Sequence, residues 1–190
     1  MNLPNKLTLI RIFMIPLFVA VFYITAIPYN FIIAGVIFAL ASITDFLDGY
    51  IARKYNLVTD FGKFLDPIAD KVLVSTALIV LVCPPVSLGH AILPWYAGIL
   101  VAVILARELI ISGFRLVAAG KNKVISADKS GKFKTFFTDL AILFILAQAN
   151  FNVYALNVTG IVLLIISTAL TVYSGIECIV KNIDVIKENK

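Results

Sequence analysis

The sequence predicts an all-α integral membrane protein with six transmembrane helices, a short N-terminal amphipathic segment and both termini in the cytoplasm. Three features predict this class: the composition, the lengths of the apolar segments and the positions of the basic residues. Of the 190 residues, 61% are hydrophobic and 14% are charged, whereas a soluble domain is nearer half apolar and a quarter charged. A core of this size cannot hide so much apolar surface, so the surrounding solvent is expected to be lipid.

Six segments have the length of about 20 mainly apolar residues that a helix needs to cross a bilayer. They are Leu9–Ala26, Phe31–Ala52, Phe61–Val82, Ile92–Ala118, Phe133–Gln148 and Val153–Val180. No basic run precedes the first segment and no small-residue cleavage site follows it, so we do not interpret it as a removable signal peptide. The regions outside the segments are short, and one membrane domain over residues 1–190 is expected.

The opening stretch, MNLPNKLTLIRI, is short and mixed in polarity. Leu3, Leu7 and Ile10 recur at helical spacing, with polar residues between them. Two interpretations stay open. The stretch is either a lead-in to the first span whose basic side chains reach the interface, or a small amphipathic helix that lies in the interface.

The basic residues fall on one side of the predicted bundle. All 16 Lys and Arg residues lie at the N-terminus, at the junction of segments two and three, in the loop between segments four and five, in the tail, or towards that side within segments three and four. The gaps around residues 28–30, 83–91 and 149–152 contain none. The positive-inside rule therefore places both termini in the cytoplasm. The net charge of +5 indicates attraction to an anionic inner leaflet, not nucleic-acid binding, and a bacterial inner (plasma) membrane is the expected location.

Residues 12–44 carry no charge, yet they lead directly into the acidic stretch TDFLDGYIARKYNLVTDFGKFLDPIADK. Successive helical residues turn by about 100°, so one arc of the second segment carries two carboxylates beside two small side chains: Asp45, Asp48, Gly49 and Ala52. A slanted stripe of the third segment carries Gly62, Asp66 and Asp70. A short loop joins the two segments, so the two carboxylate pairs are expected to face each other. We interpret Pro67 as a kink within the third segment.

Four clustered carboxylates require a compensating positive charge in a low-dielectric site. Hard divalent cations supply it, and Mg²⁺ in particular combines carboxylate ligands with substrate phosphates. Two such ions a few ångströms apart suit an in-line displacement at phosphorus. Arg53, just beyond the carboxylates, offers a planar fork that suits phosphate oxygens. The alternative, that the aspartates are interfacial charges at helix ends, fits a single aspartate better than four with interleaved small residues.

The run Asp45-x2-Asp48-Gly49-x2-Ala52-Arg53-x8-Gly62-x3-Asp66-x3-Asp70 resembles the complete signature of the CDP-alcohol phosphatidyltransferase family. Within that family, NLPNKLTLIR, ARELIISGFR and ADKSGKFKTFFTD resemble the members whose acceptor is sn-glycerol 3-phosphate. The resemblance implies transfer of a phosphatidyl group from CDP-diacylglycerol to that acceptor, which gives phosphatidylglycerophosphate and CMP. It also implies contact with membrane lipids and assembly as a homodimer.

The resemblance assigns roles to the signature residues. Two divalent ions, Mg²⁺ or Mn²⁺, would be held by Asp45, Asp48, Asp66 and Asp70. Asp70 would also be the catalytic general base that takes the proton from the attacking hydroxyl. The CDP headgroup would contact Gly49, Ala52, Arg53 and Gly62.

An anionic acceptor needs a second basic site. The candidates for its phosphate are Arg107, Arg115, Lys132 and Lys134, with Thr8 and Arg11 as weaker candidates. The competing interpretation is that Glu108 only neutralises an arginine within the membrane, and that the two lysines only follow the positive-inside rule.

Two other functions stay open. The first keeps the chemistry but uses inositol phosphate, serine or phosphatidylglycerol as the acceptor. A neutral acceptor would not need the second basic cluster, which favours glycerol 3-phosphate. The second is a small divalent-cation or proton-coupled transporter. Transport needs access from both faces, and segments one, five and six have almost no polar residues at mid-depth.

Overall fold

A computed structural model of the protein describes residues 3–55, 60–89, 91–121, 123 and 129–185. This part of the chain is helical and contains no strand. Its long helices are α1 (Leu3–Tyr23), α2 (Asn30–Lys54), α3 (Asp60–Val82), α4 (Ala97–Gly120), α5 (Lys129–Phe151) and α6 (Tyr154–Lys181). Two short 3₁₀ turns, η1 (Val86–Leu88) and η2 (Ile183–Val185), follow α3 and α6.

The predicted all-α class is confirmed, and one long helix corresponds to each predicted segment. Pro67 lies inside α3, as predicted, and does not begin a helix. The prediction for the fourth segment was wrong at its start, because α4 begins at Ala97 and not at Ile92. The cause is Pro94, which disfavours helical backbone in the residue before it. A turn in which the Ala97 N–H donates to the Pro94 carbonyl at 2.9 Å leads into the helix instead.

The opening stretch is part of α1, which runs without a break into the first apolar segment. Three of its polar residues face the protein interior: Asn5, Thr8 and Arg11 are buried, whereas Lys6 is exposed. Ile10 and Phe13 on the other side of the helix are exposed. The opening stretch therefore does not form a helix separate from the first apolar segment, and tertiary contacts take up three of its polar side chains.

Among the residues that the structure describes, four helical stretches are long and apolar enough to cross a bilayer, judged by length and composition alone: Asn5–Tyr23, Asn30–Gly49, Ala97–Gly120 and Tyr154–Lys181. They lie in α1, α2, α4 and α6. The first halves of α3 and α5 carry charged residues, among them Asp70 and Lys134. The outer surface is strongly apolar, with Phe13 73%, Leu109 75% and Leu116 74% exposed. Exposed apolar surface on this scale marks contact with lipid or another protein.

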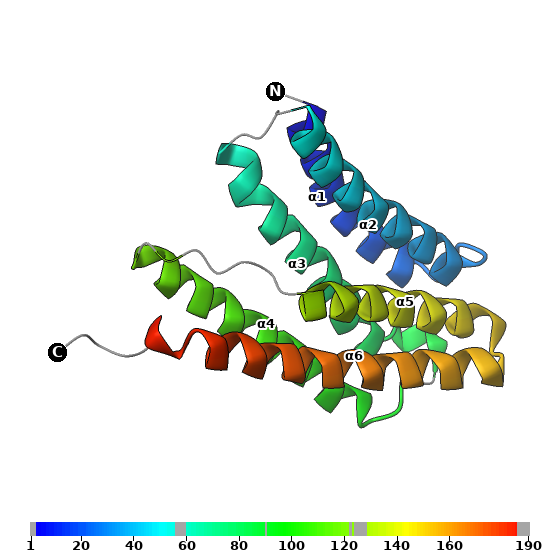
Figure 1. The fold of residues 1–190 in the computed structure, drawn as a ribbon. Coiled ribbons are helices and arrows are strands. Elements are labelled where there is room, and N and C mark those ends of the chain that lie inside the picture. The colour runs from blue at the N-terminus through cyan, green and yellow to red at the C-terminus, as the bar shows by residue number, and fades with distance from the viewer. Residues whose placement is uncertain (1–2, 56–59, 90, 122, 124–128, 186–190) are drawn as a thin grey trace.

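Helix α1 lies along α2, and α5 lies along α6 (Figure 1). Helix α3 contacts α1, α2, α4 and α5, and α5 also contacts α2. Helices α3 and α5 therefore connect the α1–α2 pair to α4 and α6. A cluster of buried rings, Phe18, Phe22, Phe31 and Phe38, fastens α1 to α2. This packing places the polar first turns of α1 beside the end of α2 and the beginning of α3 (Figure 1).

Gly160 sets the distance between α5 and α6. A Cβ atom at this position would lie 2.8 Å from Ile145 Cγ1 and 3.3 Å from the Ile145 backbone nitrogen. Gly160→Ala is therefore expected to force the helices apart, at about 1–3 kcal/mol for overpacking, less about 0.5–1 kcal/mol gained in helix propensity. The melting temperature in detergent should fall by a few degrees. Gly35→Ala is the matched control, because its Cβ would meet Leu146 at an ordinary 3.7 Å. An equal or smaller fall for Gly160→Ala than for Gly35→Ala would contradict this packing.

Candidate active site

Helix α1 brings a buried arginine to the carboxylates of α2. Arg11 Nη1 donates to Asp45 Oδ1 at 2.6 Å, and Arg11 Nη2 donates to Asp48 Oδ2. The Arg11 side chain is fully buried and that of Asp48 is 2% exposed, whereas that of Asp45 is 38% exposed. The planar guanidinium suits this arrangement, since its two terminal nitrogens reach two carboxylates that stand three residues apart on one helix face.

Thr8 lies one turn before Arg11 on the same face of α1. Its Oγ1 donates to Asp66 Oδ1 on α3 at 2.7 Å. Three carboxylates, from α2 and α3, are thus held by two neighbouring side chains of a third helix. Removing the cation from such a buried group leaves uncompensated charge, which is strongly destabilising.

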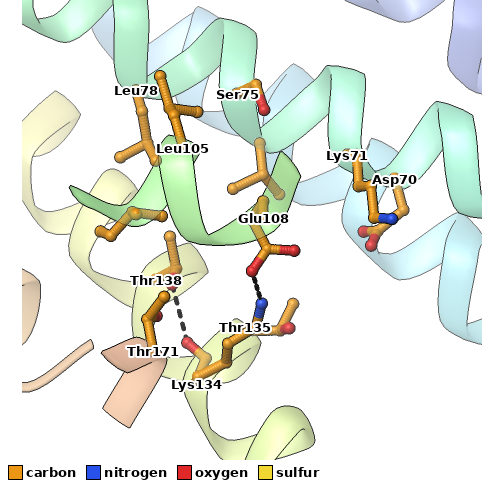
Figure 2. A pocket seen from close by; sticks show the side chains of 12 residues that line it. Asp70, Lys71, Ser75, Leu78, Leu105, Glu108, Lys134, Thr135, Thr138 and Thr171 are labelled. Carbon is orange, nitrogen blue, oxygen red and sulfur yellow. Dashed lines mark hydrogen bonds and ion pairs between the residues drawn. The ribbon is translucent and has the colours of Figure 1, made fainter. Parts of the chain in front are cut away.

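Asp70 connects this carboxylate cluster to a pocket. It interacts electrostatically with Arg11 on one side and with Lys71 and Lys134 on the other. The pocket lies between α3, α4, α5 and α6, and Figure 2 shows its lining. One end is polar, with Asp70, Lys71, Glu108 and Lys134, and the other is apolar.

Four cations gather near the polar end of the pocket. Lys134 Nζ donates to Glu108 Oε1, and Arg107 Nη1 donates to the same oxygen at 2.9 Å. Lys71 repels both Arg107 and Arg115 electrostatically, and Lys134 repels Arg107 and Lys71. In the described part of the chain, the buried Nε atom of Arg115 has no hydrogen-bond partner. The four cations together have the charge and the hydrogen-bond donors to receive an anion.

The family model for CDP-alcohol phosphatidyltransferase matches residues 1–173, which include both the carboxylates and the pocket. The chain belongs to the CDP-alcohol phosphatidyltransferase family. A protein of Bacillus subtilis (strain 168) named CDP-diacylglycerol–glycerol-3-phosphate 3-phosphatidyltransferase is 40% identical, over 98% of this chain and 97% of its own. Proteins of the same name from Rickettsia bellii and Salmonella typhimurium are 42% and 36% identical, over 92% and 93% of this chain and 91% and 92% of their own.

The phosphatidyltransferase signature is divided between α2 and α3 in the described structure. Gly49 follows Asp48 on α2, and Gly62 is buried on α3. The side chains of Ala52, Arg53 and Lys132 lie outside the described residues. Of the predicted acceptor residues, Arg107, Arg115 and Lys134 come together. Thr8 and Arg11, the weaker candidates for the acceptor's phosphate, lie instead among the carboxylates.

The carboxylate set of this phosphatidyltransferase fits hard divalent cations in its chemistry, because all its donors are the carboxylate oxygens that Mg²⁺ and Mn²⁺ prefer. Asp45 and Asp48 already share one cationic partner, Arg11, so both reach a common point. Asp66 interacts electrostatically with both. Among the residues that the structure describes, no three such side chains converge tightly enough to hold one ion.

Sequence reasoning missed several residues of the site. Lys71 was attributed to membrane orientation alone, yet it lines the pocket and donates to Ser112 Oγ at 2.5 Å. Asp139 on α5 accepts a hydrogen bond from Ser42 and interacts electrostatically with Asp70. Its Oδ1 is buried without a hydrogen-bond partner in the described part of the chain. The only sequence signal for Asp139 was its place at the end of ADKSGKFKTFFTD.

Proposed function

We propose that the protein transfers a phosphatidyl group from CDP-diacylglycerol to sn-glycerol 3-phosphate, giving phosphatidylglycerophosphate and CMP in phospholipid synthesis. The observation that carries this proposal is the continuity between two sites. The signature carboxylates of α2 and α3 lead through Asp70 into a pocket lined by cations. Family membership and the names of the relatives support the same reaction.

The membrane arrangement proposed for this reaction has six spans, with α3 and α5 as interior spans whose charged first halves line the site. Tyr29, Trp95 and Tyr154 support it, because they are exposed near the beginnings of α2, α4 and α6. Exposed aromatic residues favour the membrane–water interface, and these helices alternate in direction with α1, α3 and α5. The carboxylates lie in the second half of α2 and the first half of α3, towards the other end of the bundle. The basic residues assign that end to the cytoplasm. A bacterial inner membrane is the proposed location.

The chemistry follows from the charges. Asp45, Asp48, Asp66 and Asp70 would hold two ions, Mg²⁺ or Mn²⁺, which when bound would offset the charge on the pyrophosphate and stabilise the leaving CMP. Asp70 stands where the carboxylate cluster meets the pocket, so its carboxylate takes the proton of the acceptor's hydroxyl. The hydroxyl oxygen attacks the phosphatidyl phosphorus as the bond to CMP breaks. No side chain forms a covalent intermediate.

The rest of the proposal concerns the partners of the site. Gly49, Ala52 and Gly62 leave room for the CDP headgroup, and Arg53 holds its phosphates. Arg107, Arg115, Lys132 and Lys134 receive the acceptor's phosphate. The chain acts as one domain over residues 1–190, in contact with membrane lipids and as a homodimer.

An acceptor panel tests this function. Purified protein in detergent receives CDP-diacylglycerol and Mg²⁺ or Mn²⁺ with glycerol 3-phosphate, inositol phosphate, serine or phosphatidylglycerol, and CMP release is measured. We expect release with glycerol 3-phosphate only, and none in EDTA. Release with another acceptor would contradict the proposed acceptor site. No release with any acceptor, from folded protein, would contradict the transferase proposal and favour an ion-transport site.

Gly175 on α6 supports Arg107. A Cβ atom at position 175 would lie 3.1 Å from both Cγ and Nε of Arg107. Gly175→Ala is therefore expected to displace the guanidinium and to weaken one charged hydrogen bond by about 1 kcal/mol. The KM for glycerol 3-phosphate should rise about fivefold, while the KM for CDP-diacylglycerol stays constant. Gly113→Ala on α4 is the control, since its Cβ would meet no atom within 4 Å. Equal effects on both KM values would contradict a role in acceptor binding.

A further inference from the structure

We propose that Glu108 is an internal substitute for the acceptor's phosphate, and that the protein selects doubly charged acceptors because only they displace this carboxylate from Arg107 and Lys134. This inference rests on the proposed function, since it assumes that the pocket receives an anionic acceptor. It assigns Glu108 a role in specificity that differs from neutralising an arginine.

The contacts of Glu108 are those that a phosphate oxygen would make. Its Oε1 atom accepts hydrogen bonds from Arg107 Nη1 on α4 and from Lys134 Nζ on α5. The three side chains are only 14%, 12% and 21% exposed, for Arg107, Lys134 and Glu108 respectively. Figure 2 shows the carboxylate directed at the Lys134 ammonium group within the pocket. Carboxylate and phosphate oxygens accept from the same charged donors, so they compete for this position.

The charges around Glu108 favour the exchange. Arg107, Arg115 and Lys71 repel one another electrostatically. Lys134 in turn repels Arg107 and Lys71. A single carboxylate carries one negative charge, whereas a phosphate monoester carries nearly two at neutral pH. An acceptor with a phosphate monoester therefore offsets more of the cluster's charge than Glu108 does. A neutral acceptor, such as a free alcohol, gains nothing by competing with this ion pair.

A hydrogen bond from Ser112 holds the backbone of Glu108. The Glu108 side chain is long enough to turn away from Arg107 and Lys134. Ser112 Oγ donates to the Glu108 carbonyl at 2.5 Å, and Lys71 Nζ donates to the same Ser112 oxygen. Arg107 keeps a second contact, from Nη2 to Ser174 Oγ at 2.9 Å, that does not involve Glu108. Arg107 thus keeps a contact that holds its position when the carboxylate leaves, and its other terminal nitrogen becomes available to the phosphate.

Glu108→Gln tests the proposal, because it keeps the shape of the side chain and removes its charge. We expect the KM for glycerol 3-phosphate to fall about fivefold, with kcat and the KM for CDP-diacylglycerol within about twofold of wild type. Inorganic phosphate should inhibit the variant at lower concentrations than it inhibits the wild type. Without the donor lipid, glycerol 3-phosphate should raise the melting temperature of the variant more than that of the wild type.

Glu177→Gln is the matched control, because Glu177 pairs with Lys181 at 2.6 Å away from the pocket, and no kinetic change is expected. A higher acceptor KM in Glu108→Gln would show that Glu108 itself supports the acceptor and would overturn the proposal. An unchanged acceptor KM would reduce Glu108 to a structural ion pair and overturn it too. If the glutamine variant fails to fold, Glu108→Asp, with a shorter reach to Lys134, should lower the acceptor KM to a smaller extent. A wild-type protein inactive with every acceptor would instead refute the proposed function.

Discussion

Asp70→Asn is expected to lower kcat for CMP release by about 10³-fold, with the fold intact. The asparagine amide has nearly the shape of the carboxylate, but it neither takes a proton nor contributes a charged ligand. Loss of a positioned general base alone costs typically 10²–10⁴-fold in rate. Initial rates at saturating concentrations of both substrates measure the effect. The melting temperature in detergent and the elution volume on size exclusion establish that the variant is folded.

Asp184→Asn is the matched control for this variant. The Asp184 side chain is 65% exposed and pairs with Lys123 at 2.7 Å, outside the site. Its hydrogen bonds from Lys123 hold the pKa of Asp184 below its usual value, so it stays ionised across the neutral range. We expect wild-type kcat for this control. An Asp70→Asn variant that retains more than a tenth of the wild-type kcat would remove Asp70 from the proton transfer.

Arg11→Met is expected to be the most destabilising single substitution in the site. Methionine is similar in length, but it leaves Asp45 and Asp48 facing each other without the buried cation that now bonds to both. Removing one partner of a buried ion pair costs about 3–5 kcal/mol. For a chain of this length, that corresponds to a fall in melting temperature of about 10 °C. Added Mg²⁺ or Mn²⁺ should restore part of the loss, because the same oxygens then have a cationic partner again.

Two variants sharpen this test. Arg11→Lys keeps the charge but lacks the planar fork that reaches two carboxylates, so a smaller fall is expected. Lys123→Met removes a partner from the exposed pair with Asp184 and should change stability by less than about 1 kcal/mol. If Arg11→Met melts within about 2 °C of wild type, the two contacts of Arg11 do not stabilise the fold.

The helices and the carboxylates were predictable because their signals are local. About 20 apolar residues in a row indicate a membrane helix, and aspartates three and four residues apart share a helix face whatever surrounds them. The late start of α4 was missed because the apolar residues Ile92 and Leu93 continue the hydropathy pattern into a turn that Pro94 dictates. Hydropathy does not register this effect of proline on the backbone.

The contacts of α1 were not predictable because they depend on tertiary packing. A polar residue in the first turns of an apolar helix usually reaches towards the membrane surface, and Arg11 has that pattern in the sequence. Only the packing of α1 against α2 and α3 turns its side chain to Asp45 and Asp48. Glu108 illustrates the same limit. In the sequence, Glu108 and Arg115 are seven residues apart and fall at nearly the same helical angle, whereas the ion pairs in the structure join Glu108 to Arg107 and Lys134.

The most direct test of phosphatidyl transfer follows the acceptor's carbon atoms into the lipid product. Purified protein receives CDP-diacylglycerol, Mg²⁺ and sn-glycerol 3-phosphate labelled with ¹³C at all carbons, and mass spectrometry identifies the lipids formed. We expect labelled phosphatidylglycerophosphate and CMP in equal amounts, and about 10³-fold less of both in the same time with Asp70→Asn. CMP accompanied by unlabelled phosphatidic acid would show hydrolysis instead of transfer. The absence of any lipid product from folded protein would contradict the proposed reaction altogether.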